Sequence, residues 1–459
     1  MPENKVSAEA TPAPISAMEK RARLKEILRK KREGGGASAH NGGMEKPQQK
    51  HIDTRHYHFD QDPDVVAHRA QHTALAKLKL NNPFFVVNQG IARGTTQIDG
   101  QEYINYANYN YLGLSGDQRV TQAAIEALET YGTSVSASRI ASGERPVQRD
   151  LETELAKVYQ VEDCAVFVSG FATNVTVIGH LFGPNDLILH DELAHNSAIQ
   201  GALLSNAKRI SFPHNDTAAL ARLLAQHRDS HERVLIFIEG VYSMDGDIAD
   251  LQKFVALKKK FKTYLMVDEA HSFGVLGARG YGLREHFEIA GTDVDIWMGT
   301  LSKTLASCGG YIAGSGALIE YLKYTAPGFL YSVGITPPNA AASLAALKIM
   351  EAEPDRVATV CARADQFREL AAKSGLDIGM SQQGSAVIPI VVGNSMLSIA
   401  LSNALFAKGI NVQPVLYPAV EEDAARLRFF ITSAHTEAQV VQTVEIISDE
   451  FSRLKEAVQ

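Results

Sequence analysis

Short apolar runs alternate with helical stretches through the middle of the chain. The runs are at residues 165–168, 187–190, 209–212, 234–238 and 264–267, and a further strand-like segment is at 294–298. They are short and rich in β-branched and aromatic residues, whereas intervening segments such as 172–181 have the apolar spacing of helices. Strands and helices that alternate in this way predict an α/β domain with a large, doubly wound, mostly parallel sheet.

The two ends of the chain predict a different organisation. Toward the C-terminus we expect helices at 339–351, 356–372 and 395–407, strands at 387–392, 411–415 and 427–432, and a terminal helix. Toward the N-terminus a helical pattern begins at residue 51, and we expect strands at 84–87, 92–98 and 103–106 and a helix at 120–131. The chain therefore divides into segments 1–50, 51–105 and 106–338, followed by a smaller C-terminal α+β domain at 339–459.

Residues 1–50 have the composition of a disordered or partly helical basic tail. Within this tail, residues 18–33 contain eight basic and three acidic residues, and a helix would place Leu24, Ile27 and Leu28 on one side. One interpretation is a solvated helix without a partner. The other is a docking segment for an acidic partner, either an acyl carrier protein or an anionic membrane surface.

The overall composition narrows the class of protein. The net charge of −7 gives no electrostatic footprint for nucleic acid. Cys164, Cys308 and Cys361 are too scattered for a disulfide framework or a zinc site, and no metal site is expected. The sequence has no apolar run long enough to span a membrane and no export signal, so we expect a cytoplasmic protein, with 18–33 as the segment that could contact the inner membrane face.

Three side chains with complementary chemistry follow the predicted strands. Asp268 ends the run at 264–267, His271 comes three residues later, and Lys303 follows the strand at 294–298. A buried carboxylate needs a cationic partner, and a lysine that forms an imine needs a pocket that lowers its pKa. Pyridoxal phosphate (PLP) meets both needs, because its ring nitrogen pairs with a carboxylate and its aldehyde carbon bonds to a lysine. Helicases also carry an Asp-Glu-Ala-His run, but the GxxxxGK[ST] motif of an NTPase is missing upstream.

Longer motifs resemble a known family. EGVYSMDGD (239–247), VDEAHSFGVLGARGYG (267–282) and GTLSKTLASCGGYIAG (299–314) are similar to α-oxoamine synthases, a family that includes serine palmitoyltransferase and 8-amino-7-oxononanoate synthase. The resemblance runs from about residue 105 to 435. It implies PLP fold type I, which is like that of aspartate aminotransferase, with 51–105 as an arm against a partner subunit and 106–338 as the PLP-binding domain.

The resemblance also assigns roles in cofactor binding. Gly170 and Phe171 belong to a phosphate loop at a helix start, where free N–H groups favour an anion. His195 would be catalytic, stacking on the cofactor ring and contacting the substrate carboxylate, and Asp268 would pair with the ring nitrogen. Ser243 and His271 would bind the ring hydroxyl, and Thr300 and Ser302 the phosphate. Lys303 would bond covalently to PLP and act as the catalytic base, and Ser332 lies in a segment that reaches the phosphate of the neighbouring subunit.

Substrate contacts are implied at Tyr109, Asn110, Ser138 and Arg428. Arg428 would bind the substrate carboxylate, for which a planar guanidinium is better suited than an ammonium. Three positions depart from the common family pattern, namely Gln148, Gly334 and Thr336.

The reaction that this resemblance implies is a condensation of an amino acid with an acyl thioester, with loss of carbon dioxide, in a homodimer whose active sites lie at the subunit interface. The form of YNYLGL and GTSVSASR is closer to serine-palmitoyltransferase-like and polyketide-associated members, which favours serine and a long-chain acyl group on acyl carrier protein or coenzyme A. Alternatives are the same chemistry with alanine or glycine and another acyl thioester, and a PLP aminotransferase. A non-catalytic scaffold subunit is disfavoured because Lys303 is present.

Overall fold

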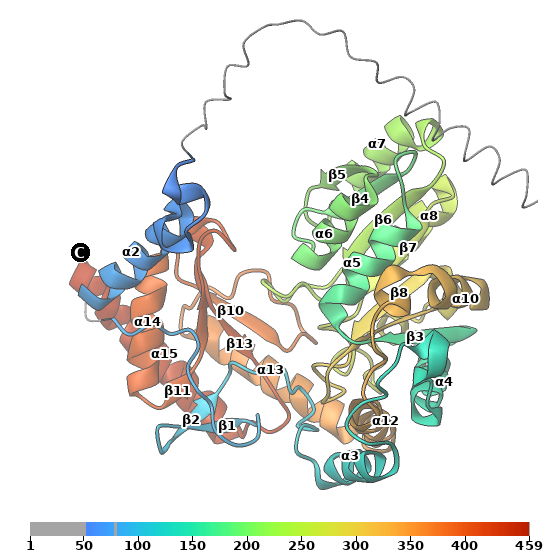
Figure 1. Ribbon diagram of the computed structural model, residues 1–459. Helices are drawn as coiled ribbons and strands as arrows, with labels where there is room; N and C mark the ends of the chain where they lie inside the picture. The colour runs from blue at the N-terminus through green and yellow to red at the C-terminus, as the bar shows by residue number, and fades with distance from the viewer. Residues whose placement is uncertain (1–51, 78–79, 459) are drawn as a thin grey trace, which may run out of the picture. The chain divides into compact units, whose positions relative to one another are not determined.

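The computed structural model describes residues 52–77 and 80–458 (Figure 1). The chain divides into two units, Met1–Ala70 and Gln71–Gln459. The predicted tail at 1–50, with its helix at 18–33, lies outside the described residues. The first described elements are η1 (Thr54–His56), η2 (Phe59–Gln61) and α2 (Pro63–Lys77). In the described part of the chain, no helix is both long and apolar enough to cross a membrane.

The largest sheet within the described residues has seven strands. Their spatial order is β3 (Asp163–Phe167), β9 (Gly310–Gly314), β8 (Ile296–Thr300), β7 (Tyr264–Asp268), β6 (Val234–Glu239), β4 (Leu187–Asp191) and β5 (Lys208–Phe212). Strand β9 runs antiparallel to both neighbours, and the remaining pairs are parallel. This confirms the predicted fold class, a large doubly wound and mostly parallel sheet with a smaller C-terminal sheet region. The prediction did not include β9.

The strands of this sheet are apolar along their whole length because both faces are covered. Every residue of β4 and of β6 is buried, as is typical of parallel strands between helical layers. The helices that connect the strands are α5 (Gly170–Leu181), α6 (Asn196–Ser205), α7 (Thr217–His227), α8 (Leu251–Phe261) and α9 (Gly282–His286), and α10 (Gly316–Thr325) follows β9. Polar side chains cap several of them; Ser169, Asp216 and Asp250 accept N–H groups of the first turns of α5, α7 and α8.

A second group of helices packs together beside β3 (Figure 1). Helix α12 (Pro337–Ala352) packs against α3 (Gln118–Tyr131) and α4 (Pro146–Tyr159). The other helices of this unit are η3 (Arg139–Gly143), η4 (Arg228–Ser230), η5 (Gly291–Asp293), α11 (Pro327–Leu330), α13 (Asp355–Lys373), α14 (Ser395–Ala407), η6 (Glu422–Ala424) and α15 (Glu437–Val458). Helix α14 has the predicted bounds, and α3, α12 and α13 begin and end within a few residues of theirs.

Two three-stranded sheets complete the structure. One contains β10 (Val387–Val391), β13 (Arg426–Phe430) and β12 (Gln413–Val415), and the other contains β1 (Thr95–Ile98), β2 (Gln101–Asn105) and β11 (Ile410–Asn411). The expected strand at 411–415 is therefore two strands, because β11 pairs with β2 and β12 pairs with β13. The strand expected at 84–87 does not form. Phe85, two residues after Pro83, has a positive φ of 59°, a conformation that extended strands exclude.

Candidate active site

The site lies at the edge of the large sheet where the parallel strands end. Glu239 ends β6, Asp268 ends β7, and the two residues are paired in register. Lys303 follows the end of β8. A cavity at this edge is lined by Gly170, Phe171, Asn174, His195, Ser197, Glu239, Asp268, Ala270, His271, Met298, Thr300 and Lys303. The structure thus brings together the carboxylate and the amine that the sequence singled out, along with five more of the predicted cofactor residues.

Asp268 is held by two donors. Its Oδ2 accepts from Asn174 Nδ2 at 2.8 Å, and its Oδ1 accepts from the backbone N–H of Ala270 at 2.9 Å. Asn174 is on α5 and also donates to Ser197 Oγ at 2.9 Å. Asn174 was not predicted, since a lone asparagine inside an apolar helix carries no signal until the position of its partner is known.

His195 caps the start of α6. Its Nδ1 accepts from the backbone N–H of Ser197 at 3.3 Å and lies 2.7 Å from Ser197 Oγ. The proton of the neutral ring is therefore on Nε2. Burial lowers the pKa of His195, and the nearby Asp268 carboxylate only partly opposes that effect, so the ring is neutral near pH 7. A neutral aromatic ring at this place is suited to stacking on a planar cofactor.

His271 is fixed by a residue that was not predicted. Tyr111 Oη lies 2.7 Å from His271 Nδ1, and the Tyr111 side chain is fully buried. Burial raises the pKa of Tyr111 well above its usual value and lowers the pKa of His271 well below its own. Both groups are therefore neutral at physiological pH, and the hydrogen bond leaves the other ring nitrogen of His271 for a ligand.

Lys303 has the electrostatic environment of an amine that reacts with carbonyls. Its pKa is lowered from 10.5 to about 8, because burial, helped by the nearby Arg428 guanidinium, outweighs the opposing effect of the Asp268 and Glu239 carboxylates. The ammonium lies 5.7 Å from the ring centroid of Tyr109. Burial and the neighbouring Asp268 carboxylate raise the pKa of Glu239 well above its usual value.

The start of α5 provides a place for a phosphate. Gly170 and Phe171 are its first two residues, and the N–H groups of a first helical turn have no partner within the helix. A side chain at Gly170 would come within 2.8 Å of Thr300 Oγ1, so the backbone there lies close to a hydroxyl. Thr300 Oγ1 is 3.2 Å from Ser302 Oγ, and Ser302 is exposed. N–H groups and hydroxyls converge here, as the predicted phosphate role requires.

Arg428 reaches the site from β13. Its Nη1 donates to the Ser243 carbonyl oxygen at 2.9 Å, and its guanidinium lies 4.7 Å from the ring centroid of Phe430. Burial lowers its pKa. Its Nε is buried and has no hydrogen-bond partner among residues 52–77 and 80–458. A buried donor without a partner is costly, and a carboxylate would satisfy it.

The residues present fit PLP. Asp268 would pair with a protonated ring nitrogen, Lys303 would bond to an aldehyde, and the start of α5 would hold a phosphate. The buried Oδ1 of Asn174, like Nε of Arg428, has no partner in the described chain, which is unusual for protein polar groups in the absence of a ligand.

Other predicted residues lie outside the lining of this cavity. The Asn110 side chain donates to the Ala92 carbonyl oxygen at 2.7 Å and accepts from Ser115 N–H at 3.0 Å, so it stabilises its own loop. Ser332 Oγ donates to the Val333 carbonyl oxygen at 3.1 Å. Ser138 precedes η3, and its carbonyl oxygen accepts from Ala141 and Gly143. The roles implied for these residues stay predictions.

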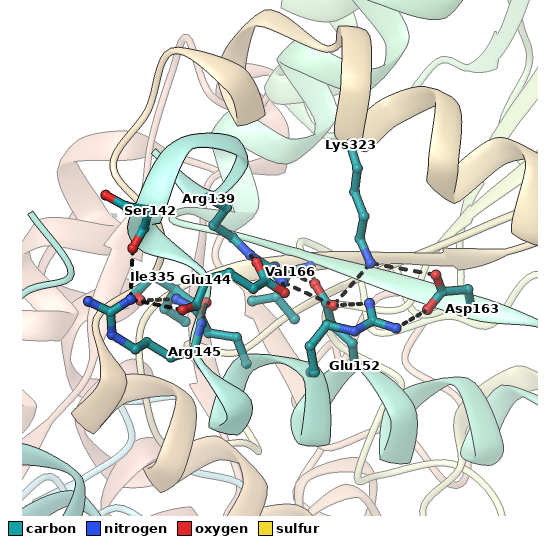
Figure 2. A network of polar contacts seen from close by, with 11 residues as sticks. Arg139, Ser142, Glu144, Arg145, Glu152, Asp163, Val166, Lys323 and Ile335 are labelled. Carbon is teal, nitrogen blue, oxygen red and sulfur yellow. Dashed lines mark hydrogen bonds and ion pairs between the residues drawn. The ribbon is translucent and has the colours of Figure 1, made fainter. Parts of the chain in front are cut away.

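A buried ion network begins at Arg139, the residue that follows Ser138, and centres on Glu152 (Figure 2). Arg139 donates to the carboxylates of Glu144 and Glu152, and Lys323 Nζ lies 3.0 Å from Glu152 Oε2. Glu152 is completely buried, and it also accepts from the Val166 N–H at 2.9 Å. The network therefore joins η3, α4, β3 and α10 around one carboxylate.

Two of the positions that depart from the family pattern touch each other in this region. Gln148 Nε2 donates to the Ile335 carbonyl oxygen at 2.8 Å, and its Oε1 accepts from Arg145 N–H at 2.9 Å. A Cβ at Gly334 would come within 2.8 Å of Arg139 Cγ and 3.2 Å of Gln148 Nε2. Gly334 thus makes room for this arrangement. Thr336 precedes α12, and its carbonyl oxygen accepts from Ala340.

Comparisons with known proteins identify the family of the chain. Residues 101–447 match the aminotransferase class I and II family. The chain is 41% identical over 348 residues to 8-amino-7-oxononanoate synthase of Symbiobacterium thermophilum, covering 76% of this chain and 88% of that protein. It is 38% identical over 361 residues to the same enzyme of Treponema denticola, covering 79% and 91%.

Solved structures give the same family. Serine palmitoyltransferase of Sphingomonas wittichii superposes with a TM-score of 0.82 at 26% identity, covering 86% of this chain and 98% of that one. 8-Amino-7-oxononanoate synthase of Francisella tularensis superposes with a TM-score of 0.66 at 30% identity, covering 76% and 98%. With the Asp268–Lys303 cavity and a match over residues 101–447, the protein belongs to the α-oxoamine synthases, PLP-dependent enzymes of the aminotransferase class I and II family.

Proposed function

We propose that this α-oxoamine synthase condenses L-alanine with a dicarboxylic acyl thioester of the pimeloyl type, giving 8-amino-7-oxononanoate, carbon dioxide and the free thiol. The identity of 38–41% to synthases of this product, over 88–91% of their length, supports the choice of substrates. In that product the amino-bearing carbon and its methyl group derive from alanine, and the rest of the chain derives from the acyl group. This choice replaces serine as the first candidate, because sequence similarity favours the alternative that used alanine.

One observation carries the chemical part of the proposal: an amine with a pKa of about 8 shares a cavity with a buried carboxylate. PLP supplies, when bound, a carbonyl that captures the amino group and a ring that takes up the electron pair left at the α-carbon. Asp268, held by Asn174, keeps a proton on the ring nitrogen. Lys303, neutral for part of the time near pH 7, takes the α-proton at Nζ.

The remaining roles concern binding and orientation. Arg428 would bind the amino-acid carboxylate through its unpaired Nε, and its contact with the Ser243 carbonyl oxygen fixes the guanidinium. His195 would cover one face of the cofactor ring, and His271, held by Tyr111, would donate to the ring hydroxyl. Orientation of the α-hydrogen toward Lys303 accounts for a large part of the expected rate, because it converts a bimolecular proton transfer into an intramolecular one.

The test is turnover of the holoenzyme with pairs of substrates. We expect release of carbon dioxide and thiol with L-alanine and pimeloyl thioester, and loss of both in Lys303→Ala. Turnover with other amino acids and acyl groups but not with this pair would contradict the proposed substrates. Amino-group transfer to a 2-oxo acid without use of a thioester would contradict the proposed reaction and support the aminotransferase alternative.

A second candidate is the condensation of L-serine with a long-chain acyl group carried by acyl carrier protein or coenzyme A. The higher TM-score with serine palmitoyltransferase, 0.82 against 0.66, favours it. The product would be an α-amino ketone such as 3-ketosphinganine. Parallel assays with L-serine and palmitoyl thioesters, on both carriers, separate the two candidates by their kcat/KM values.

We further propose that the active form is a homodimer with sites at the subunit interface. Tyr331 and Val333, which flank Ser332, are 87% and 48% exposed in the single chain, as expected of a segment that contacts a partner. Sedimentation at assay concentration tests this, and a fully active monomer would contradict it. Removal of residues 1–50 tests the docking of the basic segment 18–33 to a carrier protein or membrane surface.

A further inference from the structure

His214 lies between two buried carboxylates outside the cavity. Its Nδ1 is 2.8 Å from Asp191 Oδ1, and its Nε2 is 2.8 Å from Asp247 Oδ2. The side chains of Asp191 and Asp247 are 0% and 3% exposed, and that of His214 is 11% exposed. Since both ring nitrogens face acceptors, the ring is doubly protonated. Burial alone would lower the pKa of His214, but the two carboxylates outweigh it and raise the pKa to about 10.

The first carboxylate holds the turn that leads to His195. Asp191 ends β4, and its Oδ1 also accepts from the Leu193 N–H at 2.9 Å. Its Oδ2 accepts from the Asn215 N–H at 2.8 Å. The positive charge of His214 therefore balances the charge of Asp191, whose carboxylate binds backbone N–H groups after both β4 and β5.

The second carboxylate belongs to the loop after β6. The loop is closed by the bridge between Val241 and Ile248 and by a hydrogen bond from Tyr242 N–H to the Asp247 carbonyl oxygen at 3.0 Å. The Tyr242 and His214 rings pack at nearly a right angle, with centroids 4.5 Å apart. His214 thus ties this loop to the end of β5.

The same loop provides a hydrogen-bond acceptor for Arg428. Arg428 donates to the Ser243 carbonyl oxygen at 2.9 Å, and Arg426 donates to the Met244 carbonyl oxygen at 3.1 Å. Gly246 has a positive φ of 74°, and a Cβ there would come within 2.0 Å of the Val387 carbonyl oxygen, so the loop lies directly against β10. Any shift of the loop would move the acceptor that orients the Arg428 guanidinium.

We propose that His214 is a positioning residue: bridging Asp191 and Asp247, it fixes the loop at 242–247 and thereby orients Arg428 toward the substrate carboxylate. The inference deepens the proposed function and rests on the role proposed there for Arg428. Loss of the bridge should weaken binding of ligands that carry a carboxylate and leave amines without one unaffected. If His214 only stabilised the fold, its loss would not discriminate between ligands with a carboxylate and amines without one.

The experiment compares L-alanine with ethylamine, which lacks the carboxylate, as ligands of the holoenzyme, with the absorbance of bound PLP as the readout. In His214→Gln we expect the Kd of L-alanine to rise roughly tenfold, equivalent to about 1.4 kcal/mol, and that of ethylamine to change less than about twofold. Asp247→Asn keeps the size of its side chain and should give the same pattern. It carries the test if His214→Gln does not fold.

Arg428→Gln distinguishes a failure of the role proposed for Arg428 from a failure of the inference about His214. If L-alanine binds this variant as well as it binds the wild type, the proposed role of Arg428 is wrong. If Arg428→Gln weakens L-alanine binding but both His214→Gln and Asp247→Asn leave it unchanged, only the inference about His214 is overturned. Equal weakening of L-alanine and ethylamine binding in these two variants would also overturn it. In the double variant His214→Gln/Arg428→Gln we expect no further loss beyond that of Arg428→Gln.

Discussion

The lowered pKa of Lys303 gives the sharpest prediction for the protein without PLP. With a pKa of about 8, roughly one amine in eleven is neutral at pH 7, compared with roughly one in three thousand at the ordinary value of 10.5. The site therefore raises the concentration of reactive amine about 300-fold. This is the form that attacks an aldehyde, so the burial of Lys303 directly favours capture of the cofactor.

Competitive acylation of the apoenzyme, quantified for each lysine by mass spectrometry across a pH series, measures this pKa. We expect a midpoint near pH 8 for Lys303, with Lys373, whose side chain is 73% exposed, as the reference for reagent reactivity in the same sample. Arg428→Gln should move the midpoint upward because a nearby positive charge is lost. Asp268→Asn should move it downward because a negative charge is lost. A midpoint near 10.5, or shifts of opposite sign in these variants, would refute the reasoning.

Three further changes test other contacts. Arg428→Lys should raise the KM for the amino acid about tenfold or more, since an ammonium lacks the planar fork; steady-state kinetics with an unchanged KM would contradict this. Asn174→Ala should weaken PLP binding by about 1.5–3 kcal/mol, the value of a hydrogen bond to a charged group, and equilibrium titration of the apoenzyme measures it. Glu152→Gln should lower the free energy of unfolding by about 3–5 kcal/mol, because it removes the buried carboxylate that Arg139 and Lys323 share and leaves the buried Arg139 with Glu144 alone. The control Arg149→Gln, at a side chain 43% exposed, should cost less than about 1 kcal/mol, and similar losses for both variants in urea denaturation would contradict the role of the buried network.

The sheet and the reacting pair were predictable because they depend on local patterns. Runs such as that of β6 are apolar throughout, so their strand character and burial follow from the residues themselves. Parallel strands place their carboxyl ends at one edge, so residues that follow two neighbouring strands, such as Asp268 and Lys303, meet there. Strand β9 was missed because its Gly-Tyr-Ile-Ala-Gly sequence has weak strand propensity; it forms by pairing with β3 and β8 on either side.

The sequence by itself therefore determined the α/β class, the order of the main strands along the chain and the family, and it singled out the two residues on which the proposed chemistry depends. Only the tertiary structure decided which side chains hold those residues in place. Tyr111 and His271 are 160 positions apart, and Arg428 and Ser243 are 185 apart. Such contacts arise when separate segments fold onto one another, and no periodicity or motif within a single segment encodes them. The bridge at His214 is of the same kind, since it joins the ends of three strands whose spatial order follows from the packing of the whole sheet.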